Sequence, residues 1–346
     1  MNTSGIQRMN WKGVALFAVF IIILPFVMSS SFFITNATYT GIYTIITVGL
    51  GLLMGFAGQI SLGQAAFYGI GAYATAVLTT TYDWSPWLSL LVSVLLPAVV
   101  AYILGHTMAR LHGYYLAMAT LAFGIVIFVL LNEWKSVTKG ATGLYGIPKL
   151  EIFGFTLRQG LTYYYFVWAI ALIVIILAMN LIRSRIGRAL RSIHDSEVAS
   201  SSMGVDTGKY KMQVFILSAA LAGLAGWLFA HMSYSITPNS FGLESSVLFL
   251  VMVVLGGSTN IWGPVVGAFL ITFINLFVHK LGTKVSFITS DFEHVLYGLI
   301  LMLVVIFMPK GIIPTLMPVI AKWRTKNRNR QSGTKRGEFH GKAAGH

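Results

Sequence analysis

The chain has 346 residues, of which 56% are hydrophobic and only 10% are charged, and it carries a formal net charge of +14 without a single cysteine. A composition this apolar, with a mean hydropathy of +0.77, excludes a soluble domain and predicts a protein that crosses a membrane many times. The absence of cysteine excludes disulfides, thiolate nucleophiles and cysteine-based metal sites. The basic residues lie at the ends of apolar runs, as topology requires, which disfavours a nucleic-acid partner.

Ten apolar runs along the chain are candidates for membrane-spanning helices, each of which needs about twenty residues. Because backbone polar groups in lipid must be satisfied within a segment, the predicted fold class is all-α, with eight to ten spans. Two of the runs, 245–257 and 264–280, are short enough to be tilted, broken or re-entrant. The ten runs are 13–34, 38–56, 64–81, 87–109, 114–132, 162–182, 212–234, 245–257, 264–280 and 295–309.

The distribution of Lys and Arg predicts which side of the membrane each loop occupies. The N-terminal segment, the loop 183–211 and the tail after Lys310 are all basic, and ten spans place all three on one side, which we assign to the cytoplasm. We therefore expect a cytoplasmic N-terminus at 1–12, a transmembrane domain at 13–312 and a basic, disordered cytoplasmic tail at 313–346.

Glycine-rich segments with polar residues interrupt the apolar runs at 55–73, 139–148, 256–264 and 307–312. Two interpretations of these segments stay open, and both can hold for one segment. Small residues let helices approach closely, and unwound backbone can line a path near the middle of the membrane. The candidate path residues are Gly58, Gln59, Ser61, Gly63, Gln64, Thr142, Gly143, Gly256 and Gly257.

The loop 183–211 is a polar interruption with the features of a docking element. Short side chains from Asp195 to Met203 predict a slim helix that fits a groove on a partner. Asp195 and Glu197 are expected in its first turn, where carboxylates favour the helix dipole, and Gly204 at its C-terminal end. The alternative is an ordinary surface helix that joins two spans. The basic residues of this loop are expected to anchor it to anionic lipid; they are Arg183, Arg185, Arg188 and Arg191.

The sequence contains no motif for a catalytic or metal site. There is no GxxxxGK[ST] phosphate-binding loop, so the chain is not itself an ATPase. The histidines lack the spacing of paired metal ligands, and no serine sits in a nucleophile-elbow context. We therefore expect no catalytic residue, no metal and no cofactor.

Four patterns that occur together and in order resemble those of one family. They are GQxSLG…GAY at 58–73, TGxxGI at 142–147, GRALRxIxDxE at 187–197 and GGxxxxxGPxxGA at 256–268. The chain resembles the permease subunits of branched-chain amino acid ABC importers, specifically the LivM-like subunit, over about residues 37–312. It departs from the family pattern at Ala141–Thr142, where an extra glycine is frequent, and at Gln64, and these departures leave the solute open.

The resemblance implies an import machine that works by alternating access in the inner membrane of a bacterium or archaeon. Its other parts would be a second, LivH-like permease, two cytoplasmic ATPase subunits and an extracytoplasmic solute-binding protein. The loop 183–211 would then hold the coupling helix that docks on an ATPase. The ATPase-coupling residues would be Asp195, Glu197, Ala199 and Gly204.

Three other functions fit parts of the sequence. A relative in the same family could import urea or a short amide with the same spans and loop. An ion-driven secondary carrier would need carboxylates inside the membrane, and the apolar runs contain almost none. A purely structural membrane protein would not need polar, glycine-rich breaks in several spans.

Overall fold

The computed structural model describes residues 11–27, 30–108, 113–152, 155–157 and 160–282, together with a few isolated residues between 298 and 315. Within this part, nine helices correspond to nine of the ten predicted runs, although the first run, 13–34, covers the end of one helix and the start of the next. They are α1 (Trp11–Val27), α2 (Ser31–Ala57), α3 (Gln64–Thr80), α4 (Pro86–Met108), α5 (Tyr114–Glu133), α7 (Leu161–Arg183), α10 (Thr207–Ser233), α11 (Leu243–Gly256) and α12 (Trp262–Gly282). The tenth run, 295–309, the residues before Trp11 and the tail lie wholly or largely outside the described residues.

The helical membrane fold predicted from the sequence is confirmed. In the described part, six helical segments are long and apolar enough to cross a membrane, and α1 and α12 carry shorter apolar stretches at 13–27 and 262–277. The six segments are 31–57, 86–107, 114–133, 161–183, 207–233 and 238–256. The short run expected at 245–257 thus gains length from the preceding 3-10 turn η2 (Pro238–Phe241).

Short elements gather at one end of the bundle, which we call the strand end. They are α6 (Lys135–Thr138), η1 (Gly140–Thr142), β1 (Leu144–Tyr145), β2 (Glu151–Ile152), β3 (Phe155–Thr156), β4 (Ser235–Ile236) and η2. β1 pairs with β4 and β2 with β3, both antiparallel. The all-α prediction did not include these two-residue strands. Backbone groups of loops at the end of a helix bundle can form hydrogen bonds with a neighbouring loop. The backbone groups of lipid-facing helices are already paired within each helix.

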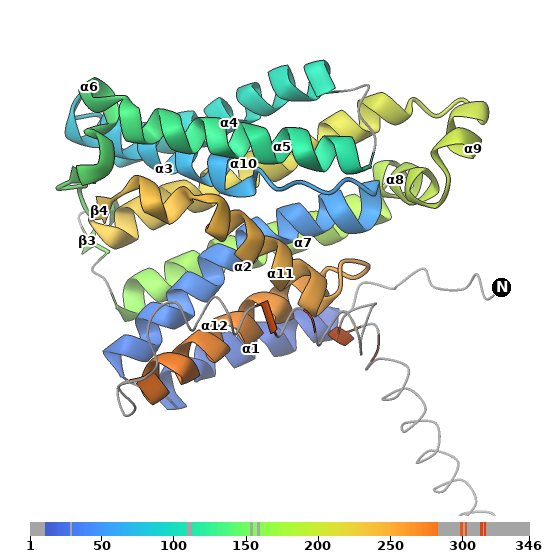
Figure 1. Cartoon of the computed structure of the whole chain (residues 1–346). Helices are drawn as coiled ribbons and strands as arrows, with labels where there is room; N and C mark the ends of the chain where they lie inside the picture. Colours follow the sequence, from blue (N-terminus) through green and yellow to red (C-terminus); the bar gives the residue numbers. More distant parts are fainter. Residues whose placement is uncertain are drawn as a thin grey trace, which may run out of the picture.

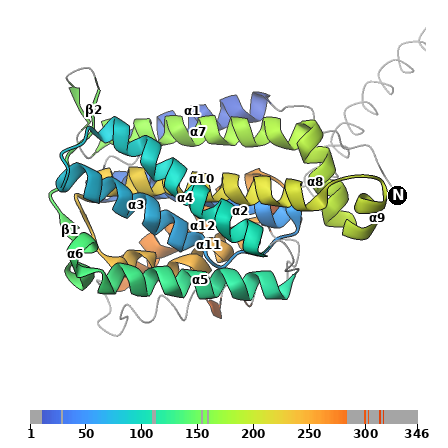
Figure 2. The ribbon, with the colours of Figure 1, turned by 90° about the horizontal axis from the view of Figure 1, so that it is seen from above.

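The opposite end of the bundle, which we call the α9 end, carries two further helices. These are α8 (Arg185–Asp195) and α9 (Glu197–Ser202), and both views show them beyond the end of α7 (Figures 1 and 2). In Figure 2, α1 and α7 run along one side of the bundle and α5 along the other, with α2, α3, α4 and α10 between them.

α10 is the central helix of the described part, because it packs against α2, α3 and α4. It crosses α3 where two glycines meet: a Cβ placed on Gly71 would lie 2.5 Å from the carbonyl oxygen of Gly223. Lipid supplies no hydrophobic force between helices, so such close backbone approach gives much of the packing energy. These two glycines therefore support the helix-packing interpretation at this crossing.

Aromatic side chains with polar groups fix α7 and α4 to the centre. Trp168 Nε1 on α7 donates to the Ala37 oxygen of α2 at 3.1 Å, and Tyr163 Oη donates to the Leu228 oxygen of α10 at 2.6 Å. Trp227 Nε1 on α10 donates to the Pro86 oxygen at the start of α4 at 3.0 Å. Each ring buries a large apolar surface and still satisfies its one polar group.

The α3–α10 crossing yields a stability prediction. Gly71→Ala should destabilise the folded chain by about 1–3 kcal/mol, because the added methyl group overlaps backbone that has no rotamer to change. Thermal unfolding of the detergent-purified chain, followed by tryptophan fluorescence, measures the effect. Gly208→Ala is the matched control, since its nearest neighbour would be the Asp206 Oδ1 at 3.8 Å. Equal melting temperatures for the two variants would contradict the close crossing.

Candidate functional site

The segment 58–63 leads from the α9 end back into the bundle. α2 ends at Gly58, which has a positive φ of 66° and lies beside His194 of α8. α3 then starts at Gln64, whose side chain reaches Ser218. Ser218 lies about 16 Å along α10 from the first residue of that helix. Figure 1 shows this stretch as a coil that runs beside the helices rather than as part of one. The sequence-predicted break between two apolar runs is thus a non-helical segment that is exposed at Gly58 and Ile60 and buried at Ser61 and Gly63.

Hydroxyl groups on three neighbouring helices satisfy the polar groups of this segment. Gln64 Nε2 donates to the oxygen and the Oγ of Ser218 on α10, both at 3.0 Å. The Leu62 amide donates to Thr120 Oγ1 of α5, and the Ala65 amide donates to Ser246 Oγ of α11, each at 3.0 Å. Non-helical backbone at membrane depth survives only with such partners.

The predicted path residues of this segment are mostly buried. Ser61 and Gln64 are each 1% exposed, and Gln59 Oε1 is buried without a hydrogen-bond partner among the described residues. The three hydroxyl partners were missed at the sequence level. A single Ser or Thr in an apolar helix gives no signal, because the same residues also bond their own helix backbone.

The other candidate path residues lie elsewhere. Thr142 and Gly143 are at the strand end, where Gly143 packs against the backbone of Ile236 in β4. Gly256 and Gly257 are buried where α11 turns back into α12, packed on Gly263. The structure therefore brings together only the five candidates between 58 and 64, and a path shared by all nine stays a prediction.

The loop after α7 folds into two helices, not one. Ser196 is extended, with φ −160° and ψ 112°, and its Oγ accepts a hydrogen bond from the Ala199 amide at 3.3 Å, so α9 begins at Glu197. The expectation that Asp195 lies in the first turn of this helix is wrong: Asp195 is the last residue of α8. Asp and Ser are both favoured N-cap residues, and here the Ser196 hydroxyl satisfies an orphan amide of α9.

The predicted C-terminal end of α9 is confirmed. Gly204 has a φ of 82°, its amide donates to the Ser201 oxygen at 2.9 Å, and the Val205 amide donates to the Ser200 oxygen at 3.1 Å. This pair of bonds is a Schellman motif, which requires a left-handed residue and so favours glycine.

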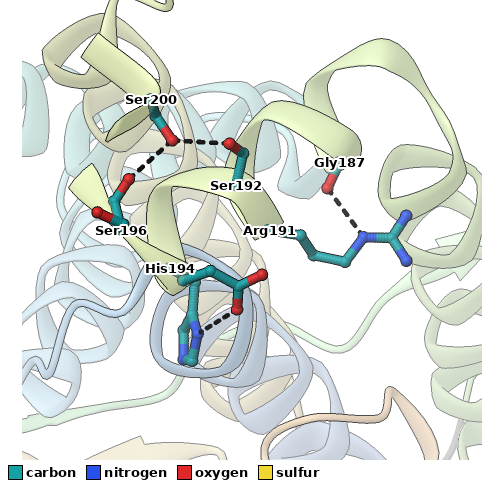
Figure 3. A network of polar contacts seen from close by, with 7 residues as sticks. Gly187, Arg191, Ser192, His194, Ser196 and Ser200 are labelled. Carbon is teal, nitrogen blue, oxygen red and sulfur yellow. Dashed lines mark hydrogen bonds and ion pairs between the residues drawn. The ribbon is translucent and has the colours of Figure 1, made fainter. Parts of the chain in front are cut away.

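Hydroxyl contacts hold α8 and α9 together as one unit. Ser192 Oγ and Ser200 Oγ lie 2.7 Å apart, and Ser200 Oγ also donates to the Ser196 oxygen at 2.9 Å (Figure 3). Ser200 is 1% exposed, which makes it the internal face of α9. The small side chains that suggested a slim helix thus also let α9 lie close to α8.

Two of the four arginines contact helix carbonyls. Arg191 donates from Nε to the Gly187 oxygen at 3.2 Å and from Nη2 to the Ile182 oxygen at 3.0 Å (the Gly187 contact is drawn in Figure 3). Arg188 Nη1 donates to the Arg183 oxygen at 3.2 Å. Guanidinium groups at the C-terminus of α7 satisfy its last carbonyls and favour its dipole. Lipid anchoring by this loop stays a prediction.

The outward face of α9 is more apolar than the sequence suggested. Val198 is 78% exposed and Met203 is 83% exposed, with Ala199 exposed between them. Two large apolar side chains that project from so short a helix form a small contact surface. We call Val198, Ala199 and Met203 the α9 face.

Glu197 connects α9 to the central helix. Lys211 Nζ on α10 donates to Glu197 Oε2, and the side chains of Glu197 and Lys211 are only 33% and 17% exposed, respectively. A half-buried, charge-assisted contact is stronger than an exposed ion pair. Glu197, predicted as a coupling residue, therefore points toward α10.

Lys211 and Ser218 lie on one face of α10. They are seven residues apart, close to two full turns of about 3.6 residues each. The same face thus receives Glu197 from α9 and Gln64 from α3. α10 is thus one continuous helix that contacts both α9 and the start of α3, which directly follows the segment 58–63. We call residues 58–63 the broken segment.

The Gln64–Ser218 contact yields a second prediction. Gln64→Leu keeps the volume but removes both hydrogen bonds, and should cost about 1 kcal/mol of stability. Ser218→Ala should cost less when Gln64 is already Leu than when it is present, because the two changes remove the same interaction. Thermal unfolding of the single and double variants measures this coupling. Strictly additive losses would show that the hydrogen bond from Gln64 Nε2 to Ser218 Oγ contributes nothing.

The comparisons with known proteins agree on one family. The family model described as branched-chain amino acid transport system / permease component matches residues 32–305. The chain is 31% identical over 330 residues to the high-affinity branched-chain amino acid transport system permease protein LivM of Escherichia coli, a match that covers 88% of this chain and 76% of that protein.

More distant relatives come from the same group. The probable LivM permease of Methanocaldococcus jannaschii is 23% identical, over 79% of this chain and 91% of that protein. The permease LivH of Escherichia coli is also 23% identical, over 80% and 93% respectively. No solved structure gives a significant match. From the extent of the family match and the identity to LivM, the chain belongs to the permease component family of branched-chain amino acid transport systems.

Proposed function

We propose that this chain is a membrane-embedded permease subunit of an ATP-driven importer for leucine, isoleucine and valine. The family match and the 31% identity to a LivM permease support this function. The chain has no phosphate-binding loop of its own, so the energy must come from separate ATPase subunits. We infer that two such subunits, a LivH-like second permease and an extracytoplasmic solute-binding protein complete the assembly. Similarity to LivH as well as LivM supports a pair of related permeases.

The observation that carries the mechanism is the arrangement of α9. Its apolar face projects from the end of the bundle, while its first residue, Glu197, contacts Lys211 of α10. An ATPase that grips the α9 face therefore acts on a helix pair that is tied to the centre of the permease. α9, with Glu197, Ala199 and Gly204, is the proposed coupling helix, and Asp195 belongs to the neighbouring α8.

The same arrangement supports the orientation in the membrane. The α9 end carries the basic residues of the loop 183–211, and short basic loops face the cytoplasm. We infer that this end is cytoplasmic, together with both chain termini, and that the strand end faces outward. A soluble ATPase then reaches α9, and a solute-binding protein reaches the strand end.

The alternatives have less support. Among the described residues, no Asp or Glu is buried, so an ion-driven carrier would lack coupling-ion carboxylates. The relatives are named as branched-chain amino acid permeases, and nothing in the site favours urea or a short amide.

Charge on the α9 face should uncouple the importer. Val198→Asp or Met203→Asp places a carboxylate in an apolar contact and should lower solute-stimulated ATP hydrolysis by about tenfold or more, equivalent to about 1.4 kcal/mol or more. The measurement uses proteoliposomes that contain the full importer, with the loaded binding protein as the stimulus.

Thr107→Asp is the matched control, because Thr107 is exposed near the end of α4 and so lies on a different helix from the α9 face. Co-purification of the ATPases with each variant separates lost docking from lost stimulation. Normal docking and stimulation in both α9 variants would show that the ATPase contacts another surface.

A further inference from the structure

A cavity of about 400 Å³ opens at the strand end of the bundle. The N-terminal half of α2, the start of α7, the C-terminal end of α10 and the residues around β4 and η2 form its walls. This volume is many times what one water requires, so the cavity has room for a molecule the size of an amino acid. Its volume falls in the range of small-molecule sites.

Among the described residues, the lining combines neutral hydroxyl groups with an apolar surface and contains no charged side chain. Tyr39, Phe229 and Met232 supply the apolar surface. The hydroxyl groups come from Thr35, Thr38, Ser233, Ser235, Thr237 and Ser240. A fixed charge would hold an ionic solute, whereas this lining suits one that is neutral overall and has an aliphatic part.

The hydroxyl groups differ in what they can offer a ligand. Thr35 Oγ1 donates to the Ser31 oxygen at 3.0 Å and Thr38 Oγ1 to the Ile34 oxygen at 2.8 Å, so both retain lone pairs that accept from an ammonium group. Ser233 Oγ is buried and has no hydrogen-bond partner among the described residues, so its proton is available to a carboxylate. A buried, unpaired hydroxyl is costly unless a ligand or water completes it.

The cavity ends on a closed cluster of aromatic rings. Tyr39 and Phe229, which line it, have ring centroids 6.1 Å apart. Phe229 also contacts Tyr68 at 5.4 Å, and Tyr68 contacts Phe249 at 5.8 Å. Tyr68 lies one turn after Gln64 on α3, and Phe249 lies about one turn after Ser246 on α11. We call Tyr39, Tyr43, Tyr68, Phe229, Phe241 and Phe249 the aromatic cluster. Its rings line the cavity at Tyr39 and Phe229 and continue through Tyr68 and Phe249 to the helices that hold Gln64 and Ser246.

We propose that this cavity is a binding site for a zwitterionic aliphatic amino acid within the permease itself, on the outward side of the aromatic cluster. The inference rests on the proposed import of amino acids and adds a solute site in this chain. The aliphatic side chain contacts Tyr39, Phe229 and Met232, and the charged groups contact the hydroxyls. Release toward the broken segment requires the rings of the aromatic cluster to separate.

The absence of native cysteine makes the site directly testable. Ser233→Cys places a single thiol in this chain, and a charged, membrane-impermeant thiosulfonate reagent modifies it in proteoliposomes that contain the full importer. Leucine at ten times its dissociation constant should slow modification about tenfold, because about nine-tenths of the sites are occupied. Lysine at the same concentration should not. The modification rate is read by mass spectrometry of this chain.

Ser85→Cys is the matched control. Ser85 is exposed in the turn between α3 and α4 at the same end of the bundle, outside the cavity lining. Its modification rate should not change with leucine. Protection of both variants would indicate a general effect of leucine, and protection of the Ser233→Cys variant by urea but not by leucine would indicate a different solute class. Either result overturns the proposal.

A transport assay completes the test. Thr35 is exposed at the cavity, so Thr35→Trp fills the opening without entering the core and should reduce leucine uptake about tenfold, while Thr35→Ser retains uptake. If the native importer takes up leucine with ATP, but leucine does not protect the Ser233→Cys variant and Thr35→Trp transports normally, the cavity proposal fails and the proposed function stands. If the native importer takes up no leucine, the proposed function itself fails.

Discussion

One face of α10 joins every part of this permease that the proposed mechanism uses. Lys211, Ser218 and Phe229 lie seven and eleven residues apart, which keeps them on nearly the same side of a continuous helix. Lys211 contacts the proposed coupling helix, and Ser218 contacts the start of α3 after the broken segment. Phe229 contacts Tyr68 within the aromatic cluster. The distance along the axis from Lys211 to Phe229 is about 27 Å. A displacement of α9 therefore acts on a rigid element that reaches the cavity at the strand end.

The contacts along this face are strong enough to define one conformation and weak enough to exchange. Gln64 and Ser218 form neutral hydrogen bonds, each worth about 1 kcal/mol net. The aromatic pairs add about 0.5–1.5 kcal/mol each beyond their buried area. In the part of the chain that the structure describes, no buried carboxylate locks the interior. Alternating access can then proceed by breaking small, neutral contacts. The free energy that this requires is small enough for ATPase subunits to supply.

The sequence predicted the features that depend on local composition. Apolar runs located most of the helices within a few residues, but α1 ends at Val27 rather than at 34 and α2 begins at Ser31 rather than at 38. The break around Gln64 and the glycine end of α9 were visible because Gly, Gln and Ser are unusual between apolar runs. The start of α9 was misplaced because both Asp195 and Ser196 can precede a helix, and only the tertiary arrangement decides between them. The small residues of this stretch predicted a slim helix, but they did not predict that the side chains of Val198 and Met203 are exposed.

Contacts between distant segments could not be predicted. Ser218, Thr120 and Ser246 are single hydroxyls in apolar helices, and their pairing with residues 62–65 depends on how four helices pack. Glu197 was expected to face a partner subunit, yet its contact with Lys211, fourteen residues away, joins it to the permease's own core. The cavity at the strand end likewise arises from segments separated by up to about two hundred residues, which no local pattern records.

The most direct test of this account exchanges the charges that connect α9 to α10. Glu197→Lys alone or Lys211→Glu alone places like charges together and should reduce solute-stimulated ATP hydrolysis by about tenfold. The double variant, with the charges reversed, should recover most of the native stimulation, because the attraction is restored. The account is contradicted if either single variant is stimulated normally, or if the double variant remains as impaired as the worse single one.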